Sequence, residues 1–458
     1  MNIQAINYYN NSIYTPGVKK TASTPAFSAV FPMINRKPSA NTGMPAAQPV
    51  YTLRTSLSTK EEKTKYNAVS EMLDRKTKRT LNKLLKEGKL LNNISNDRST
   101  VLDNLYKIVQ NPRIMGLNKE TILKETIETI DFPFIITQKF GDLPEKARAE
   151  ILSSATPVNS NIPFTNENLD VHSSTCPAAS IEFNLAHKMP AEFARMAESL
   201  SSEKMSVTKR IDINNLSQSF INTIWMLDAF KTPHKMLDWN TLEVELKPDR
   251  NAILRARVQN TYWDKGERSV IDVLMQSTFM NVGAQNTYDS MIDRRIPKYN
   301  DDDSGLIDIE KNFAEELATG KGKVCVTYQK MDDNGKLIGY ECEQSETLQH
   351  IRDTLNLGDN VIIGYTYCDN DNIVIGGHEI TIIGIEKGKN GKEYFVCNDT
   401  DDGKDEPIRY PVEELLPRIH HAGIPKSVLI NNVEFIEGWK ELMEIYKANK
   451  EAAYSTAA

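Results

Sequence analysis

After about residue 56, the first third of the chain carries apolar residues at helical spacing. Over residues 60–152 this periodicity predicts four helices, the second with Ser99 as its N-cap and ending before Pro112. Residues 1–55 are rich in Asn, Pro, Ser, Thr and Ala without a sustained period, which is typical of a disordered tail. We therefore predict a tail over 1–55 and a helical domain over 56–152.

The middle of the chain is mixed, and the last third is rich in strands. Helical patterns recur at 191–201, 214–230, 268–282 and 307–319, while Thr241–Leu246 and Ala252–Val258 alternate like a short β-pair. Beyond residue 321, apolar and β-branched runs predict strands at Val324–Gln329, Val361–Tyr367, His378–Ile385 and Glu393–Asn398. Asn390-Gly391 is a strong hairpin signal, so we expect the last two strands to be antiparallel neighbours. We assign 431–458 to a C-terminal helix and tail.

Cys176 lies where a polar connector, residues 153–175, runs into a predicted helix that ends near Lys188. A thiol at a helix N-terminus faces unpaired backbone N–H groups and the positive end of the helix dipole. Both favour the thiolate, which is the nucleophilic form of cysteine. Pro177 fits this place, because the first helical turn tolerates a residue that lacks an N–H.

His378 stands at a Gly-Gly-to-strand junction, and Asn398 and Asp399 close the next strand. Antiparallel pairing brings the start of one strand to the end of the other, so we expect these residues to meet at one edge. They suit a nucleophilic site in which His378 takes the Cys176 proton and Asp399 or Asn398 orients the imidazole. The backbone N–H of Cys176 is expected to donate to the oxyanion.

Composition narrows the class of protein. The 458 residues are 40% hydrophobic with a net charge of −7, which suits a globular core and argues against a nucleic-acid partner. No apolar run is long enough for a membrane span, and no signal peptide is evident, so we expect a cytoplasmic protein, with non-standard export left open. The five cysteines include no Cys-x-x-Cys pair, and Ile382 stands where a His378-Glu379 zinc motif needs its second histidine. We predict no metal and no cofactor.

The helix-opening Cys176, the run Gly-Gly-His378-Glu-Ile-Thr-Ile-Ile-Gly and the run Tyr-Phe-Val-Cys-Asn-Asp399 resemble the papain-like cysteine peptidases. The similarity is greatest to the bacterial branch related to bacteriocin-leader-processing peptidases, and it covers about 165–200 and 320–430. It implies an α+β fold with a helical half that carries the Cys and an antiparallel β half that carries the His. The catalytic domain would span 153–430, with a helical or mixed insertion at about 191–320.

The resemblance also implies roles for individual residues. In that branch the strand after the His ends in Asp-Pro, which favours Asp399 over Asn398, although Thr400 replaces the Pro. A Gln shortly before the Cys usually completes the oxyanion hole, but no Gln lies between Gln138 and Cys176. Asn168 and His172 are the candidate substitutes.

Three functions remain open at this point. The first is a cysteine peptidase or amidase that acts on a peptide or protein substrate through a thioester. The second is an acyltransferase similar to the transglutaminases, and the third is a non-catalytic interaction protein on a degenerate peptidase scaffold. One interpretation of the helical region 56–152 is that it covers the cleft as an inhibitory region, because a polar linker joins it to Cys176.

Overall fold

A computed structural model describes most of the chain between Leu53 and Leu429, and within it helices and antiparallel strands are mixed. The predicted α+β class is therefore confirmed. Most of the predicted tail over 1–55, and all of 431–458, lie outside the described residues. The described ranges are 53–92, 94–139, 143–160, 162–169, 173–262, 267–295, 305–306, 308–332, 334–389, 391–401 and 406–429.

Helices make up one half of the molecule. The N-terminal helices are α1 (Lys60–Glu71), α2 (Arg75–Lys86), α3 (Lys89–Asn92), α4 (Val101–Gln110), α5 (Lys119–Asp131) and α6 (Glu145–Ser154). They are followed by α7 (Cys176–Lys188), α8 (Pro190–Leu200), α9 (Phe220–Ala229), α10 (Ala252–Tyr262), α11 (Val270–Gly283) and α12 (Asp308–Thr319). A three-stranded antiparallel sheet of order β1-β3-β2 packs among them, from β1 (Val207–Asp212), β2 (His234–Met236) and β3 (Thr241–Leu246).

Two local predictions in the helical half are wrong. The N-cap of α4 is Thr100 rather than Ser99, because the Thr100 hydroxyl and the Asp103 carboxylate satisfy each other's backbone N–H in a capping box. The segment after residue 251 is the helix α10 and not a strand paired with β3, which lies between β1 and β2. Ala, Leu, Arg and Gln favour a helix there, and Ala252 and Ala256 are buried one turn apart.

The other half is a six-stranded antiparallel sheet of order β10-β9-β8-β7-β11-β4. Its strands are β4 (Lys323–Thr327), β7 (Val361–Cys368), β8 (Val374–Lys387), β9 (Glu393–Asn398), β10 (Ile408–Pro411) and β11 (Ile419–Pro425). A separate ribbon joins β5 (Gln329–Met331) to β6 (Leu337–Tyr340). The helices of this half are α13 (Gln344–Asn356) and α14 (Val412–Leu415).

The predicted hairpin between β8 and β9 is confirmed. The two strands pair antiparallel, and Gly391 in the turn has a φ of 80°, a conformation that glycine adopts at little cost. Asn390 lies outside the described residues. His378 is not the first residue of its strand as predicted, because β8 begins at Val374 and its early residues pair with β7.

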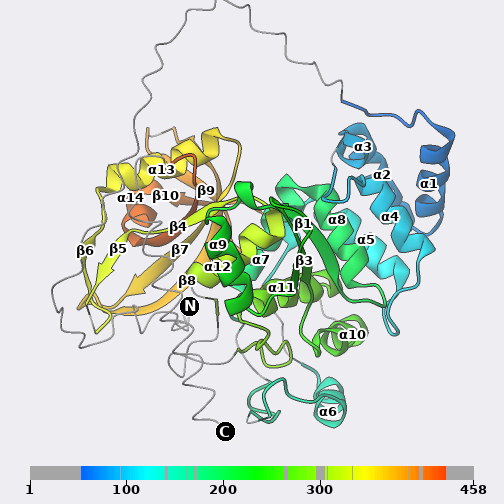
Figure 1. The fold of residues 1–458 in the computed structure, drawn as a ribbon, viewed down its shortest axis with the longest axis horizontal. Helices are drawn as coiled ribbons and strands as arrows, with labels where there is room; N and C mark the ends of the chain where they lie inside the picture. The colour runs from blue at the N-terminus through cyan, green and yellow to red at the C-terminus, as the bar shows by residue number, and fades with distance from the viewer. Residues whose placement is uncertain are drawn as a thin grey trace, which may run out of the picture.

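The helical region 56–152 is not a domain of its own. Apolar residues of α1, α2, α4 and α5 share one continuous core with those of α7, α8, α11 and α12, so the predicted 191–320 insertion belongs to the same body. Amphipathic helices need a partner face to bury their apolar stripe, and here α8 and α11 supply it. In Figure 1, α1–α4 lie at the end of the molecule away from the β half, and α6 lies apart from them, below α10.

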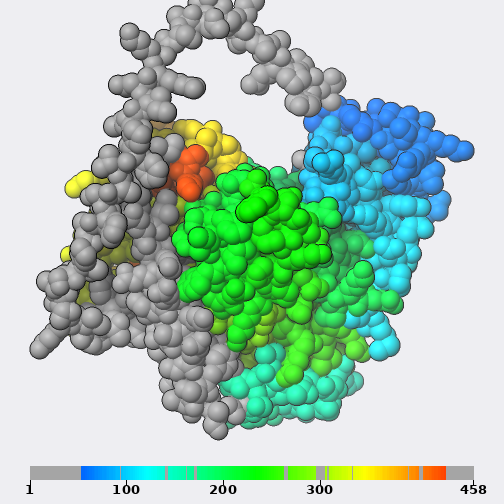
Figure 2. Space-filling view, viewed as in Figure 1, coloured from blue at the N-terminus to red at the C-terminus, as the bar shows by residue number. Residues whose placement is uncertain are grey.

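The same packing is visible on the surface. In Figure 2 the blue and cyan N-terminal helices continue without a break into the green middle of the chain. Within the described residues, no helix combines the length and the apolar character that crossing a membrane requires.

A buried carboxylate joins the two halves where α12 leads into β4. Glu316 is 3% exposed, and its Oε1 accepts the backbone N–H groups of Ser217, at 2.9 Å, and Lys323, at 2.8 Å. Burial is the largest influence and raises the pKa of Glu316 to about 7, although these hydrogen bonds oppose it. Folding therefore favours the protonated form, and the joint weakens as the group ionises.

The replacement Glu316→Gln tests this joint. An acid with a raised folded pKa contributes stability below its unfolded pKa, and this contribution is lost as pH rises toward the folded value. We expect Glu316→Gln to exceed wild type in free energy of unfolding by up to about 3 kcal/mol at pH 8, and to match it at pH 4. Urea unfolding at the two pH values measures the difference. Equal differences at both values would contradict the prediction.

Candidate functional site

Cys176 is the first residue of α7 and is buried, with 1% of its surface exposed. Pro177 occupies the first turn as expected, and the helix ends at Lys188 before Pro190. All residues from Cys176 to Ala186 are buried, because α7 is covered by α8, α11 and α12 on the helical side and by β8 on the other. This packing fixes the thiol at the junction between the halves.

His378 lies within β8, opposite Tyr365 of β7, and is 8% exposed. Its Nε2 is 2.8 Å from Oδ1 of Asp399, directly after β9, and its ring also forms a hydrogen bond with the side chain of Cys176. The Tyr365 ring stands edge-on to the imidazole at 5.9 Å and limits how the ring can turn.

Asp399, rather than Asn398, contacts the imidazole. The backbone N–H of Asp401 donates to Oδ1 of Asp399 at 3.0 Å, and the Tyr410 hydroxyl donates to Oδ2 at 3.0 Å. Three donors thus hold the carboxylate in one orientation. The side-chain oxygen of Asn398 is buried without a hydrogen-bond partner among the described residues.

The electrostatics of the pair favour an ionised form. Burial lowers the pKa of His378, but the charge and hydrogen bond of Asp399 and the contact with Cys176 outweigh it and hold this pKa well above its ordinary value. Burial likewise raises the pKa of Asp399, yet the His378 charge and the donors around the carboxylate bring it down to about 2. An imidazolium next to a carboxylate is therefore stable here, and it is a suitable counter-ion for a thiolate.

Of the two predicted oxyanion substitutes, only Asn168 lies within the described residues. Asn168 uses its side-chain amide within its own turn, where Nδ2 donates to the Pro163 carbonyl at 2.7 Å and Oδ1 accepts from the Thr165 N–H at 2.8 Å. His172 lies outside the described residues.

The structure brings Gln138 to this region instead, although sequence reasoning discarded it for its distance along the chain. Gln138 is 1% exposed, and its backbone N–H donates to the carbonyl of Thr400, next to Asp399, at 3.1 Å. Its side-chain oxygen is buried without a hydrogen-bond partner among the described residues. Only the fold could reveal this proximity, because the sequence carries no local signal for it.

Neither a metal site nor a disulfide is found in the described part of the chain. No three His, Cys, Asp or Glu side chains there are grouped in a way that could hold a metal ion. The five cysteines are free thiols. The site itself presents a thiol, an imidazole and a carboxylate.

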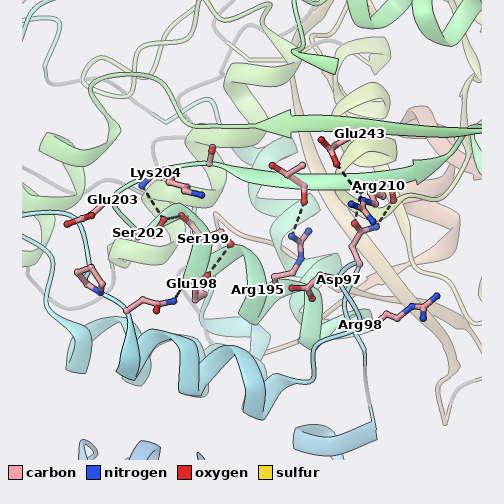
Figure 3. A pocket seen from close by; sticks show the side chains of 15 residues that line it. Asp97, Arg98, Arg195, Glu198, Ser199, Ser202, Glu203, Lys204, Arg210 and Glu243 are labelled. Carbon is pink, nitrogen blue, oxygen red and sulfur yellow. Dashed lines mark hydrogen bonds and ion pairs between the residues drawn. The ribbon is translucent and has the colours of Figure 1, made fainter. Parts of the chain in front are cut away.

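A second feature is a polar cavity of about 1140 Å³ between α4, α8 and the β1–β3 sheet (Figure 3). Its charged groups largely satisfy one another or the backbone: Arg210 lies 3.5 Å from Glu243, and Arg195 donates to the carbonyl of Thr208 at 3.0 Å. Asn96 pairs with the backbone of Arg210 and so covers the edge of β1. None of the three site residues lines this cavity. Its charged and largely paired lining is typical of a solvated polar groove.

Comparison with known proteins gives no neighbour for this chain: no family model, no curated protein and no solved structure matches it.

The replacement Asp399→Asn tests the electrostatics of the pair. We expect the pKa of His378 to fall toward its ordinary value, because the variant removes the charge that holds it up while keeping the shape. NMR titration of imidazole-labelled protein measures it, with the His378 signal assigned by its loss in His378→Gln. Asp401→Asn is the matched control in the same loop and should leave the His378 pKa high. An unchanged His378 pKa in Asp399→Asn would contradict the assignment.

Proposed function

We propose that the protein is a cysteine-type peptidase or amidase. The observation that carries this proposal is the continuous series of side-chain contacts from Cys176 through His378 to Asp399, with 2.8 Å between the imidazole and the carboxylate. A nucleophile bonded to a base, which a third group orients, is the arrangement that nucleophilic catalysis needs.

The reaction follows from these positions. His378 accepts the thiol proton, and the Cys176 thiolate attacks an amide carbonyl to form a tetrahedral oxyanion. The imidazolium then protonates the leaving amine, which departs and leaves a thioester on Cys176. A water molecule that gives its proton to His378 attacks the thioester, and the acid product leaves as the thiol is restored. Asp399 keeps the ring in the orientation that serves both steps.

The architecture supports a papain-like reading of the fold. The nucleophile opens a helix of the helical half, and the base lies on an antiparallel sheet in the other half. The acid follows the strand hydrogen-bonded to that of the base. This is the division of roles that the resemblance in the sequence implies, with peptide or protein as the substrate class.

Gln138 is the glutamine best suited to complete the oxyanion hole with the N–H of Cys176. Gln276 also lies near, but its amide is fully engaged with Thr137, Glu182 and Thr175. Gln138 has an unpartnered side-chain oxygen and lies beside the residue that follows Asp399. In this role the Nε2 amide group of Gln138 donates to the substrate oxygen, while its Oε1 can only accept.

The burial of the site favours one alternative function. Cys176 is 1% exposed and His378 is 8% exposed, so a polypeptide reaches the thiol only after the covering segments move. A site that stays closed would suit a non-catalytic interaction protein on a peptidase scaffold. Turnover decides between the two.

Peptide cleavage tests the proposal. We expect new termini when the protein is incubated with a proteome-derived peptide library, and a loss of at least about 10⁴-fold in rate for Cys176→Ala and His378→Ala. Mass spectrometry of the products measures the cleavage. Cys368→Ala, which removes an exposed thiol, is the control and should cleave like wild type.

The same spectra separate the alternatives. With a primary amine added, a hydrolase yields mainly the free acid, while an acyltransferase yields mainly the amine adduct. Absence of both products, and of any covalent adduct on Cys176, would sink the enzymatic proposal and leave the interaction protein.

The replacement Gln138→Ala tests the oxyanion donor. Removing one such donor lowers kcat by about 10²–10³-fold with little effect on KM, because the bond forms only in the transition state. Steady-state kinetics on the best peptide from the library measures both constants. Gln349→Ala, on the exposed face of α13, is the control. A change confined to KM would assign Gln138 to substrate binding instead.

A further inference from the structure

One buried ion pair holds all three residues that precede the nucleophile. Arg268 and Asp293 lie 3.1 Å apart, with side chains 1% and 0% exposed. The guanidinium bonds the hydroxyls of Ser173 and Thr175, while Oδ2 of Asp293 accepts from the N–H of Ser174 at 3.0 Å and the backbone carbonyl of Asp293 accepts from the Ser174 hydroxyl at 2.8 Å. The loop that delivers Cys176 to α7 is therefore bound at every position.

The same unit reaches the segment that carries Gln138. The backbone N–H of Arg268 donates to the carbonyl of Lys139 at 2.8 Å. Gln276 of α11 accepts from the Thr175 hydroxyl at 3.2 Å and donates to the carbonyl of Thr137 at 3.0 Å. These bonds fix residues 173–175 relative to residues 137–139. The first segment lies next to the thiol, and the second lies next to the residue that follows Asp399.

These contacts change what Thr175 does. Thr175 stands at the N-cap of α7, where a threonine hydroxyl usually accepts a backbone N–H of the first turn. Here it forms no such cap, and its φ and ψ of −96° and 17° are not the extended values of a capping residue. Its hydroxyl is committed to Arg268 and Gln276 instead. The first-turn N–H groups of α7 are therefore not occupied by this side chain.

The energetics of the Arg268–Asp293 pair indicate that it serves to position the loop rather than to stabilise the fold. A buried ion pair gains little net stability, because desolvation of both charges offsets their attraction. Asp293 adopts a left-handed backbone conformation, with a φ of 49°, which carries strain for a residue other than glycine. The backbone strain at Asp293 and the desolvation of both charges are offset by the contacts with residues 173–175 and, for Asp293, by the Tyr288 hydroxyl that donates to it.

We propose that Arg268 and Asp293 are positioning residues for the nucleophile. They hold residues 173–175 in the conformation from which α7 begins, and so fix both the position of the Cys176 thiol and the direction of the Cys176 N–H that donates to the oxyanion. The inference rests on the proposed function and adds to it a unit that touches neither the substrate nor the reacting atoms.

Arginine variants test the inference. Arg268→Gln should lower kcat by about 10²-fold with KM within about 3-fold, as for loss of oxyanion stabilisation. Arg268→Lys should recover only part of kcat, because an ammonium cannot reproduce the planar fork of donors that binds several acceptors at once. Asp293 is kept intact, since its charge also faces the buried Arg255.

Arg113→Gln is the matched control. The Arg113 side chain is equally buried, pairs with Glu198 at 3.0 Å and bonds the hydroxyl of Ser201, and none of its hydrogen bonds within the described residues goes to residues 173–175. We expect it to lower the melting temperature about as much as Arg268→Gln while kcat stays at the wild-type level. If Arg268→Gln fails to fold, Arg268→Lys against Arg113→Lys carries the same comparison.

The outcomes separate the two proposals. Equal kcat in Arg268 and Arg113 variants, with wild type active, would overturn the positioning role and leave the peptidase proposal standing. A change in KM alone, with kcat at the wild-type level, would also overturn the positioning role. A wild-type protein that cleaves nothing and forms no adduct on Cys176 would overturn both.

Discussion

The docking of the N-terminus of α7 against β8 is the contact on which the candidate site depends. It brings a thiol from one half of the molecule to an imidazole from the other, and both are buried where they meet. The helical core that includes α7, α8 and α11 and the six-stranded sheet thus serve to hold two side chains at bonding distance, with the acid supplied by the next strand over.

The contact between α7 and β8 places ionisable groups in a buried position. A buried imidazole would normally be neutral, but the Asp399 carboxylate reverses that preference, and Tyr410 and the N–H of Asp401 keep the carboxylate ionised. On the helical side, the Arg268–Asp293 pair and Gln276 bind the loop before the thiol. Networks of satisfied buried polar groups specify one arrangement, because leaving any member unpaired is costly. The bonded groups on both sides of the junction therefore favour one arrangement of the thiol, the imidazole and the carboxylate.

The burial of the three side chains constrains access to the candidate site. The thiol, imidazole and carboxylate are almost wholly shielded from water, which strengthens every electrostatic interaction among them. The segment 137–139 bonds both α11 and the residue after Asp399, so it ties the two halves together beside the site. On the proposed function, a substrate has to loosen contacts of this kind without disturbing the contacts that orient Cys176.

Local patterns in the sequence determined the types of most elements, the β8–β9 hairpin and the position of Cys176 at a helix start, because periodicity, turn residues and helix ends are encoded by near neighbours. The closeness of His378 to Asp399 followed from the same hairpin, although the true start of β8 and the choice of Asp399 over Asn398 needed the structure. The sequence was misleading where a segment fitted two local patterns. The helix α10 was predicted as a strand, and Ser99 was predicted as the N-cap that Thr100 provides.

Only the tertiary structure decided the rest. That α1–α5 share a core with α7, that Gln138 lies beside the residue after Asp399, and that Arg268 and Asp293 hold the loop before Cys176 depend on which buried faces fit together. These contacts join residues far apart in the chain, and their energy comes from packing and desolvation at surfaces that exist only once the elements have formed. For that physical reason the sequence by itself determined the chemical groups of the site, whereas the fold decided which of them meet.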